Sequence, residues 1–294
     1  MKKHSSKFRL SSPVFERPDE NRNKNPKRMI FLSVEGDETE RTYFQYLDEQ
    51  LDNALIHIEV LRHKRGDGYS DPEYVIELLD EYISLREGEV IPEKEFQLIT
   101  DKYSKEDIMK YLAEDPGLTE KEKRSFREDL MKVGIDLEYR RYLEEYKGET
   151  DYFAVVLDRD SGNHSRELME DCSRTCAEKN YGFYVTNPCF EFWLLLHLCD
   201  VKAEFSNEEL EQMKKNPKVS RQHTFVSREL SKRAHHAKTI SPGKFKETYF
   251  PNIGQAIQNV QEFATDFPEL FDQLGSNLPK LFEELKEEYV NGKG

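Results

Sequence analysis

Short, almost continuous apolar runs alternate along the first two thirds of the chain with longer segments whose apolar residues recur at helical spacing. Continuous runs of this length are typical of strands that are buried on both faces. The runs occupy residues 28–34, 56–62, 152–158 and 181–187. Because helical patterns separate them, the order predicts an α/β fold with a doubly wound, mostly parallel sheet.

Helices are predicted between and after these strands. Thr39 is placed to cap the first helix, and Asp71 before Pro72 is typical of an N-cap followed by the first helical residue. Pro188 is expected to open the most apolar helix, which contains FEFWLLLHL. The predicted helices cover residues 41–51, 72–87, 165–180, 189–198, 204–215, 250–267 and 278–290.

Changes in composition divide the chain into four parts. The first part is rich in Ser, Pro, Asn and charge, which predicts a flexible basic tail. A densely charged helical insertion interrupts the α/β core, and a helical, basic C-terminal extension follows it. The four parts are the tail at 1–28, the core at 29–91 and 151–199, the insertion at 92–150, and the extension at 200–294.

The net charge of −14 argues at first sight against nucleic-acid binding, but the charge is segregated. Residues 1–28 carry a local charge of +6 and residues 214–246 carry +9, which leaves −29 on the rest of the chain. A local basic field attracts phosphates whatever the total charge is, although two solvated basic segments explain the pattern equally well. The predicted nucleic-acid-binding residues are Lys214, Lys215, Arg221, Arg228, Lys232, Arg233, Lys238, Lys244 and Lys246.

The sequence shows no pattern typical of a membrane span, a secretory signal or a disulfide framework. No apolar stretch approaches the roughly twenty residues of a membrane span, and the basic N-terminus lacks the apolar region of a secretory signal. The four cysteines form no CxxC pair. Cys172 and Cys176 lie one helical turn apart, so a metal pair is conceivable, but small half-buried thiols in a reducing cytosol are the preferred interpretation. We therefore expect a soluble, cytoplasmic protein with no membrane partner.

Acidic residues stand at the ends of two predicted strands. Glu35 ends the first strand, and Asp158 with Asp160 ends the third. In a parallel sheet these ends share one edge, and strand alternation would turn Asp158 and Asp160 to the same side if the strand continued. Adjacent carboxylates repel one another unless a cation neutralises them, and Mg²⁺ or Mn²⁺ suits such oxygen ligands. A polar loop after a buried strand is the plain alternative.

Three further residues are weaker candidates for the same site. His164 follows the acid pair closely, and Glu40 follows Glu35. Glu191 lies in the first turn of the apolar helix, where a structural role through the helix dipole or an ion pair is slightly favoured. His57 and His197 are interpreted as structural residues.

Several catalytic motifs are absent. The sequence contains no GxxxxGK followed by Ser or Thr, so ATP hydrolysis by this chain is not expected. It also lacks HExxH, GxSxG, and GxGxxG after a strand.

Taken together, these residues resemble the RloB-like family, whose fold is a variant of Toprim. The matching blocks are Glu35-Gly36 with Thr39-Glu40 and Tyr43-Phe44, then Asp158-Arg159-Asp160, and then NPCFEFWLLLH at 187–197. The resemblance implies a catalytic glutamate at Glu35 and a metal-binding pair at Asp158 and Asp160. It also implies Mg²⁺-dependent chemistry at phosphodiester bonds, in phage-defence loci where a separate AAA-type ATPase is often encoded nearby.

The leading hypothesis is therefore a metal-dependent Toprim-type nuclease that acts on DNA or RNA in antiviral defence, in which Glu35, Asp158 and Asp160 hold Mg²⁺ and form the catalytic site. A homodimer is left open. One alternative is a non-catalytic Toprim-like subunit that docks on an ATPase. Another is a phosphatase of the haloacid-dehalogenase type, for which Asp158 and Asp160 would supply the nucleophile and the acid. Only the Toprim hypothesis requires Glu35.

Overall fold

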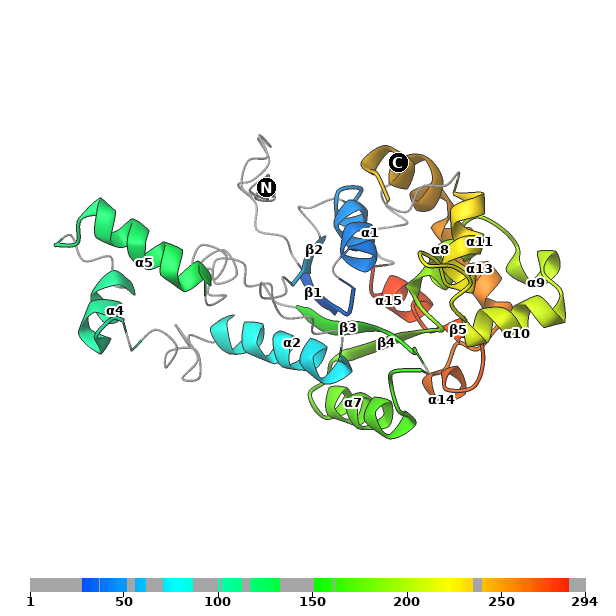
Figure 1. Ribbon diagram of the computed structural model, residues 1–294, viewed down its shortest axis with the longest axis horizontal. Helices are drawn as coiled ribbons and strands as arrows, with labels where there is room; N and C mark the ends of the chain where they lie inside the picture. Colours follow the sequence, from blue (N-terminus) through cyan, green and yellow to red (C-terminus); the bar gives the residue numbers. More distant parts are fainter. Residues whose placement is uncertain are drawn as a thin grey trace, which may run out of the picture.

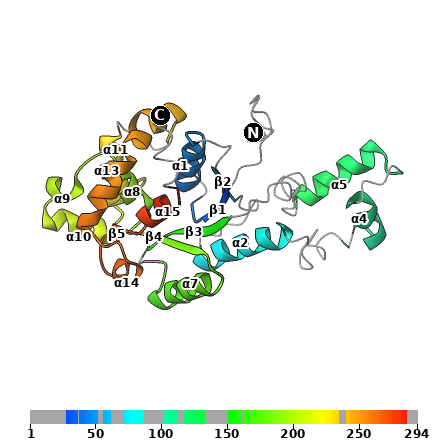
Figure 2. The same ribbon diagram turned by 180° about the vertical axis from the view of Figure 1, so that it is seen from behind.

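The structure is a computed structural model in which a central sheet carries helices on both faces (Figure 1). The view from behind shows the same layers, with the two helices of the insertion at the far end from the C-terminal helices (Figure 2). The structure describes residues 28–36, 38–51, 56–61, 71–86, 100, 102–112, 117–132, 151–160, 162–234 and 240–285. The predicted tail at 1–27 lies outside them.

The sheet has five strands in the order β2-β1-β3-β4-β5. Strands β1 to β4 pair in parallel, and β5 pairs with β4 in the antiparallel direction. The strands are β1 (Arg28–Val34), β2 (Ile56–Val60), β3 (Tyr152–Asp158), β4 (Gly182–Asn187) and β5 (Gly275–Ser276). The predicted α/β fold with a mostly parallel sheet is confirmed. Strand β5 was missed because two residues are too short to show a pattern.

Helices surround the sheet and continue into the C-terminal part. The α-helices are α1 (Thr39–Asp48), α2 (Pro72–Arg86), α4 (Lys105–Leu112), α5 (Glu120–Lys132), α7 (Arg166–Glu178), α8 (Phe190–Leu196), α9 (Val201–Glu204), α10 (Asn207–Lys215), α11 (Phe225–Arg233), α12 (Pro242–Lys244), α13 (Ile253–Asn259), α14 (Phe267–Leu270) and α15 (Pro279–Glu284). A π-helical turn, η1, spans Phe245–Tyr249, and short 3-10 turns span Phe250–Asn252 and Val260–Glu262.

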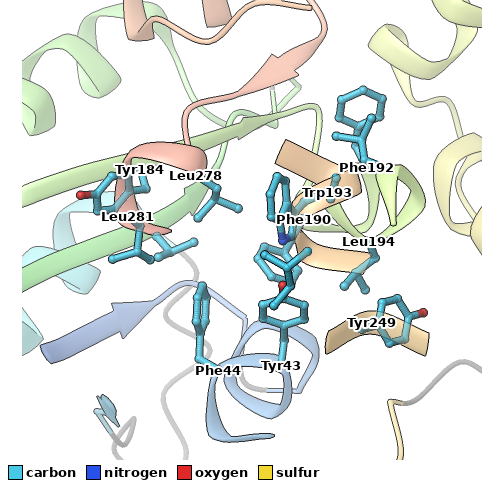
Figure 3. Close-up of a cluster of buried hydrophobic side chains, with 14 of the residues drawn as sticks. Tyr43, Phe44, Tyr184, Phe190, Phe192, Trp193, Leu194, Tyr249, Leu278 and Leu281 are labelled. Carbon is cyan, nitrogen blue, oxygen red and sulfur yellow. The ribbon is translucent and has the colours of Figure 1, made fainter. Parts of the chain in front are cut away.

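Two hydrophobic cores cover the two faces of the sheet. Leu32 and its neighbours on one face pack with α1, α8 and the C-terminal helices, whereas Phe31 faces α2 and α7. Figure 3 shows the first core, where Trp193 of α8 lies among side chains from α1 and the C-terminal part. The Trp193 ring stacks on Phe282 with a centroid distance of 5.5 Å. The described residues after 200 therefore share a core with the sheet.

Three local predictions were wrong. Thr39 is the first residue of α1, and Glu38 occupies the N-cap position without a side-chain hydrogen bond. Pro188 follows a cis peptide bond and lies before Cys189, the N-cap of α8, so it does not open the helix. No helix was predicted for residues 216–249, but this basic stretch contains α11 and η1 because Phe225 and Phe245 are buried in the core.

The described residues of the insertion contain two helices, α4 and α5. Phe126 of α5 contacts the rings of Tyr103 and Tyr111, with centroid distances of 4.6 and 4.2 Å, which joins α5 to α4. No helix among the described residues is long and apolar enough to cross a membrane.

Candidate active site

The ends of β1 and β3 lie side by side at one edge of the sheet. Val34 pairs with Val156, and the Glu35 N–H donates to the carbonyl of Val156 at 3.1 Å. This bond extends the strand ladder by one residue and places Glu35 opposite the end of β3. Parallel pairing therefore brings Glu35 next to Asp158, although 122 residues lie between them in the sequence.

The Glu35 carboxylate is largely enclosed, with 11% of its side chain exposed. Its Oε2 accepts a hydrogen bond from the Asp158 N–H at 2.9 Å. Burial raises the pKa of Glu35 to about 8; the Asp158 N–H opposes this rise, while the nearby charges of Glu40, Asp160 and Asp71 add to it. Without a cation, Glu35 therefore holds a proton at neutral pH.

Asp158 has the same electrostatic problem. Its Oδ1 accepts from the backbone N–H of Phe190, the first residue of α8, at 2.8 Å. Burial raises the pKa of Asp158 well above its usual range, and the charges of Glu40, Glu35 and Glu191 raise it further. The single N–H of α8 does not offset the repulsion among these acids, so the negative charge at this edge of the sheet is not neutralised by the described residues.

Asp160 reaches the site by a turn and not by strand alternation. Strand β3 ends at Asp158, and Asp160 has a φ of 27°, in the left-handed region. Its carbonyl accepts from the N–H groups of Asn163 and His164, both at 2.9 Å, and its Oδ2 accepts from Asn163 Nδ2 at 2.7 Å. The Asp160 charge still raises the pKa of Glu35, so the turn keeps it near that carboxylate.

Glu40 and Glu191 both contribute charge to this edge. A Cβ atom at Gly36 would lie 2.1 Å from Glu40 Oε2, so the absence of a side chain at position 36 makes room for the buried Glu40 carboxylate. Glu191, in the first turn of α8, is half-buried and raises the pKa of Asp158. The structure thus brings both weaker candidates to the predicted site.

His164 lies between the two strand ends. Its ring is buried, with Nδ1 3.1 Å from the Asp158 carbonyl and Nε2 3.7 Å from Glu35 Oε1. Because a carbonyl only accepts, Nδ1 must carry the proton in this bond, and Nε2 is directed to Glu35.

Arg159 supports His164 from the opposite face of the sheet. Its Nη1 donates to the His164 carbonyl at 2.7 Å. Its guanidinium also lies over the Phe271 ring, 5.3 Å from the centroid. The side chain is buried, and no acidic residue forms an ion pair with it within the described part of the chain.

His197 has a structural environment, away from the acidic edge. His197 is buried between the Tyr43 hydroxyl, 3.0 Å from Nε2, and the Trp193 carbonyl, 2.9 Å from Nδ1. Burial lowers the pKa of His197 to about 4, so the ring is neutral. The thiols of Cys172 and Cys176 are buried, and burial raises the pKa of each to about 12, which disfavours the thiolate that a metal pair needs.

The sequence matches the family of RloB-like proteins over residues 30–285. This chain belongs to the RloB-like family. Comparisons with curated proteins and with solved structures find no match. The family match covers both strand ends and the whole of α8, so the acidic edge lies inside the region that defines this RloB-like chain.

The donor set of the RloB-like site suits a hard cation. Glu35, Asp158 and Asp160 offer carboxylate oxygens, and neither Lys nor Arg pairs with them among the residues that the structure describes. In the same residues, no three His, Cys, Asp or Glu side chains are grouped closely enough to hold a metal by themselves. Mg²⁺ commonly takes one or two protein carboxylates and completes its shell with water and phosphate oxygens, so the residues fit such an ion.

The basic stretch divides into paired and solvent-facing cations. Glu229 is buried and pairs with Arg228, Lys232 and Arg233 at 2.9, 2.8 and 3.4 Å. Two more of the predicted cations have partners: Lys214 pairs with Glu211 at 3.1 Å, and Lys244 donates to the Ala234 carbonyl. Three are exposed, namely Lys215, Arg221 and Lys246. Lys238 lies outside the described residues.

Proposed function

We propose that this RloB-like chain is a Toprim-type, metal-dependent nuclease that cleaves phosphodiester bonds of DNA or RNA. The observation that carries the proposal is the pair of largely enclosed carboxylates, Glu35 and Asp158, at the ends of adjacent parallel strands, joined by the 2.9 Å bond from the Asp158 N–H. Buried acids whose pKa values are raised by burial and by one another are typical of functional sites.

Each residue has a defined task in this proposal. Asp158 and Asp160 would hold Mg²⁺ or Mn²⁺, which when bound supplies Lewis-acid polarisation of a phosphodiester oxygen and lowers the pKa of water. Glu35, with a pKa of about 8, is suited to accept a proton from water or return one to a leaving oxygen near neutral pH. His164 orients Glu35 from beside Oε1.

The proposed biological setting rests on the family resemblance. The RloB-like resemblance supports a role in prokaryotic antiviral defence, together with a separate AAA-type ATPase. The absence of a nucleotide-binding GxxxxGK loop from the sequence agrees with that division of labour.

The central test is a cleavage assay with Mg²⁺ and Mn²⁺ on labelled single-stranded DNA, duplex DNA and RNA. Glu35→Gln, Asp158→Asn and Asp160→Asn should each reduce cleavage by about a hundredfold or more. Asp171→Asn, which changes an exposed acid on α7, is the matched control and should cleave normally. Undiminished cleavage by an Asp158→Asn/Asp160→Asn double variant would refute the mechanism.

A non-catalytic partner subunit of a defence complex is the second candidate. It is favoured by the lack of a ready-made metal cluster among the described residues. Calorimetry decides between the two, because a partner subunit needs no cation whereas the nuclease must bind Mn²⁺ at millimolar concentration. A phosphatase would instead hydrolyse a phosphate monoester in a reaction that depends on Asp158 but not on Glu35.

A further inference from the structure

The turn between α10 and α11, residues 216–224, has a fixed shape. Lys218 and Thr224 form an antiparallel bridge, and the N–H groups of Val219 and Ser220 donate to the His223 carbonyl at 2.9 and 3.1 Å. The Ser220 hydroxyl also accepts from the N–H groups of two following residues. Residues 217–222 are all exposed, so a rigid backbone presents their side chains to solvent. We call residues 216–224 the basic turn.

Among the described residues, no acid pairs with the cations of the basic turn. No Asp or Glu occurs between Glu211 and Glu229, and both of these acids already pair with other cations. Lys218 and Arg221 are exposed, and neither contacts an acid in the described part of the chain. The turn is therefore a concentrated positive surface on a protein whose net charge is −14.

Asn216 connects this surface to the acidic site. Its φ of 42° ends α10 in the left-handed region, its Oδ1 accepts from the Val226 N–H at 3.0 Å, and its Nδ2 donates to Cys189 Sγ at 3.4 Å. Cys189 is the N-cap of α8, and the next residue, Phe190, donates its N–H to Asp158. Helix α11 also packs on α8 (Figure 1), so the basic turn is joined through α8 to the strand end that carries Asp158.

We infer that the basic turn binds the phosphodiester backbone of nucleic acid and holds it against the acidic edge of the sheet. This inference rests on the proposed function. An acidic centre repels a polyanion, so a nuclease of this charge needs an adjacent cationic surface to retain its substrate. Lys218 and Arg221 suit phosphate oxygens, and residues 216–224 include no Phe, Tyr or Trp for stacking on bases, which points to binding that is independent of sequence.

The test compares two double variants that remove the same charge. Lys218→Ala/Arg221→Ala removes the solvent-facing cations, whereas Lys214→Ala/Lys232→Ala removes cations from the flanking helices that are already paired with acids. Fluorescence anisotropy with labelled DNA and RNA, in EDTA and over a series of salt concentrations, measures backbone contacts without cleavage. The turn variant should bind about tenfold more weakly. The slope of the logarithm of its affinity against the logarithm of the salt concentration should be shallower by about 0.7–0.9 per lost phosphate contact.

The inference fails if both double variants lose affinity equally, because net charge alone would then explain the loss. It also fails if neither variant changes the salt dependence of binding. A third contradicting outcome is competition by polyglutamate that equals competition by a polynucleotide of the same charge, since the surface would then suit an acidic protein. Unchanged thermal unfolding of both variants confirms that folding is not the cause. If the turn variant loses binding and no form of the protein cleaves nucleic acid, the binding role of the basic turn is supported and the nuclease function is rejected. If the protein cleaves nucleic acid and the turn variant binds it normally, the nuclease function is supported and the binding role of the basic turn is rejected.

Discussion

The backbone N–H of Asp158 donates to Oε2 of Glu35 over 2.9 Å, so the two acidic strand ends are joined by a direct hydrogen bond. This bond uses the amide of Asp158 and leaves its carboxylate for the N–H of Phe190. Strand pairing therefore sets the distance between the acids, and burial sets their charge state. Both properties can be measured without knowledge of the substrate.

The raised pKa of Glu35 makes the metal-free protein sensitive to pH. The pKa is about 8 in the folded protein and 4.5 ordinarily, so the folded state binds this proton more tightly than the unfolded state. Stability must therefore fall as pH rises from about 4.5 towards 8. We expect Glu35→Gln to raise the melting temperature in EDTA by several degrees above pH 8 and to leave it unchanged near pH 4, as measured by calorimetry. Asp171→Asn is the control, and an equal increase at every pH would contradict the assignment.

Metal binding should release this proton. The apparent affinity for Mg²⁺ or Mn²⁺ is expected to increase with pH, by up to about tenfold per unit below the pKa, and to level off above it. Titration calorimetry in two buffers with different ionisation enthalpies counts the protons released. Glu35→Gln should reduce the number of protons released, whereas an unchanged release would assign the proton to another group, such as the buried Asp158 carboxyl, whose pKa is also raised.

Arg159 is expected to position the loop that carries Asp160 and His164. Its buried guanidinium donates to the His164 carbonyl, so Arg159→Met removes that donor at similar volume and should lower the unfolding free energy by about 1–3 kcal/mol. Arg174→Met, which removes an exposed helical ion pair on α7, should cost less than about 0.5 kcal/mol. Urea unfolding measures both.

A positioning role for Arg159 has a second readout. If the His164 ring moves away from Oε1 of Glu35, the midpoint of the pH-dependent stability loss should shift in Arg159→Met. A variant that is less stable but has the same midpoint would show that Arg159 only stabilises the fold.

A feature of this site could be predicted from the sequence only where the interactions that form it are local. Continuous apolar runs located the strands that end at Val34 and Asp158, because burial on both faces leaves a strong pattern. The position of Asp160 could not be predicted, since a single left-handed residue replaces strand alternation. The sequence also did not indicate which basic residues would form ion pairs. Glu229 pairs with three cations only because α11 folds, and that helix depends on the burial of Phe225 in the core.

His57 provides a test of charge in the fold away from the acidic edge. Its Nδ1 lies 3.0 Å from Asp48 at the end of α1, and its Nε2 lies 3.3 Å from Glu59 on β2. Burial lowers the pKa of His57, but the hydrogen bonds and charges of Asp48 and Glu59 more than offset this and raise the pKa to about 10, against an ordinary value of 6.5. The imidazolium therefore joins α1 to the edge strand of the sheet.

Because the folded protein holds this proton more tightly, the stabilisation by His57 is complete below about pH 6.5 and is lost as pH rises through about 10. We expect His57→Gln to lower the unfolding free energy by about 1–3 kcal/mol at pH 6, with a deficit that shrinks towards pH 10. Urea unfolding at several pH values measures the difference, from which the Glu35 titration cancels because both proteins share it. His223→Gln, on the basic turn, is the control for the loss of a half-buried histidine and should show a small deficit. A His57→Gln deficit that stays constant or grows with pH would mean that the ring is neutral in the folded protein.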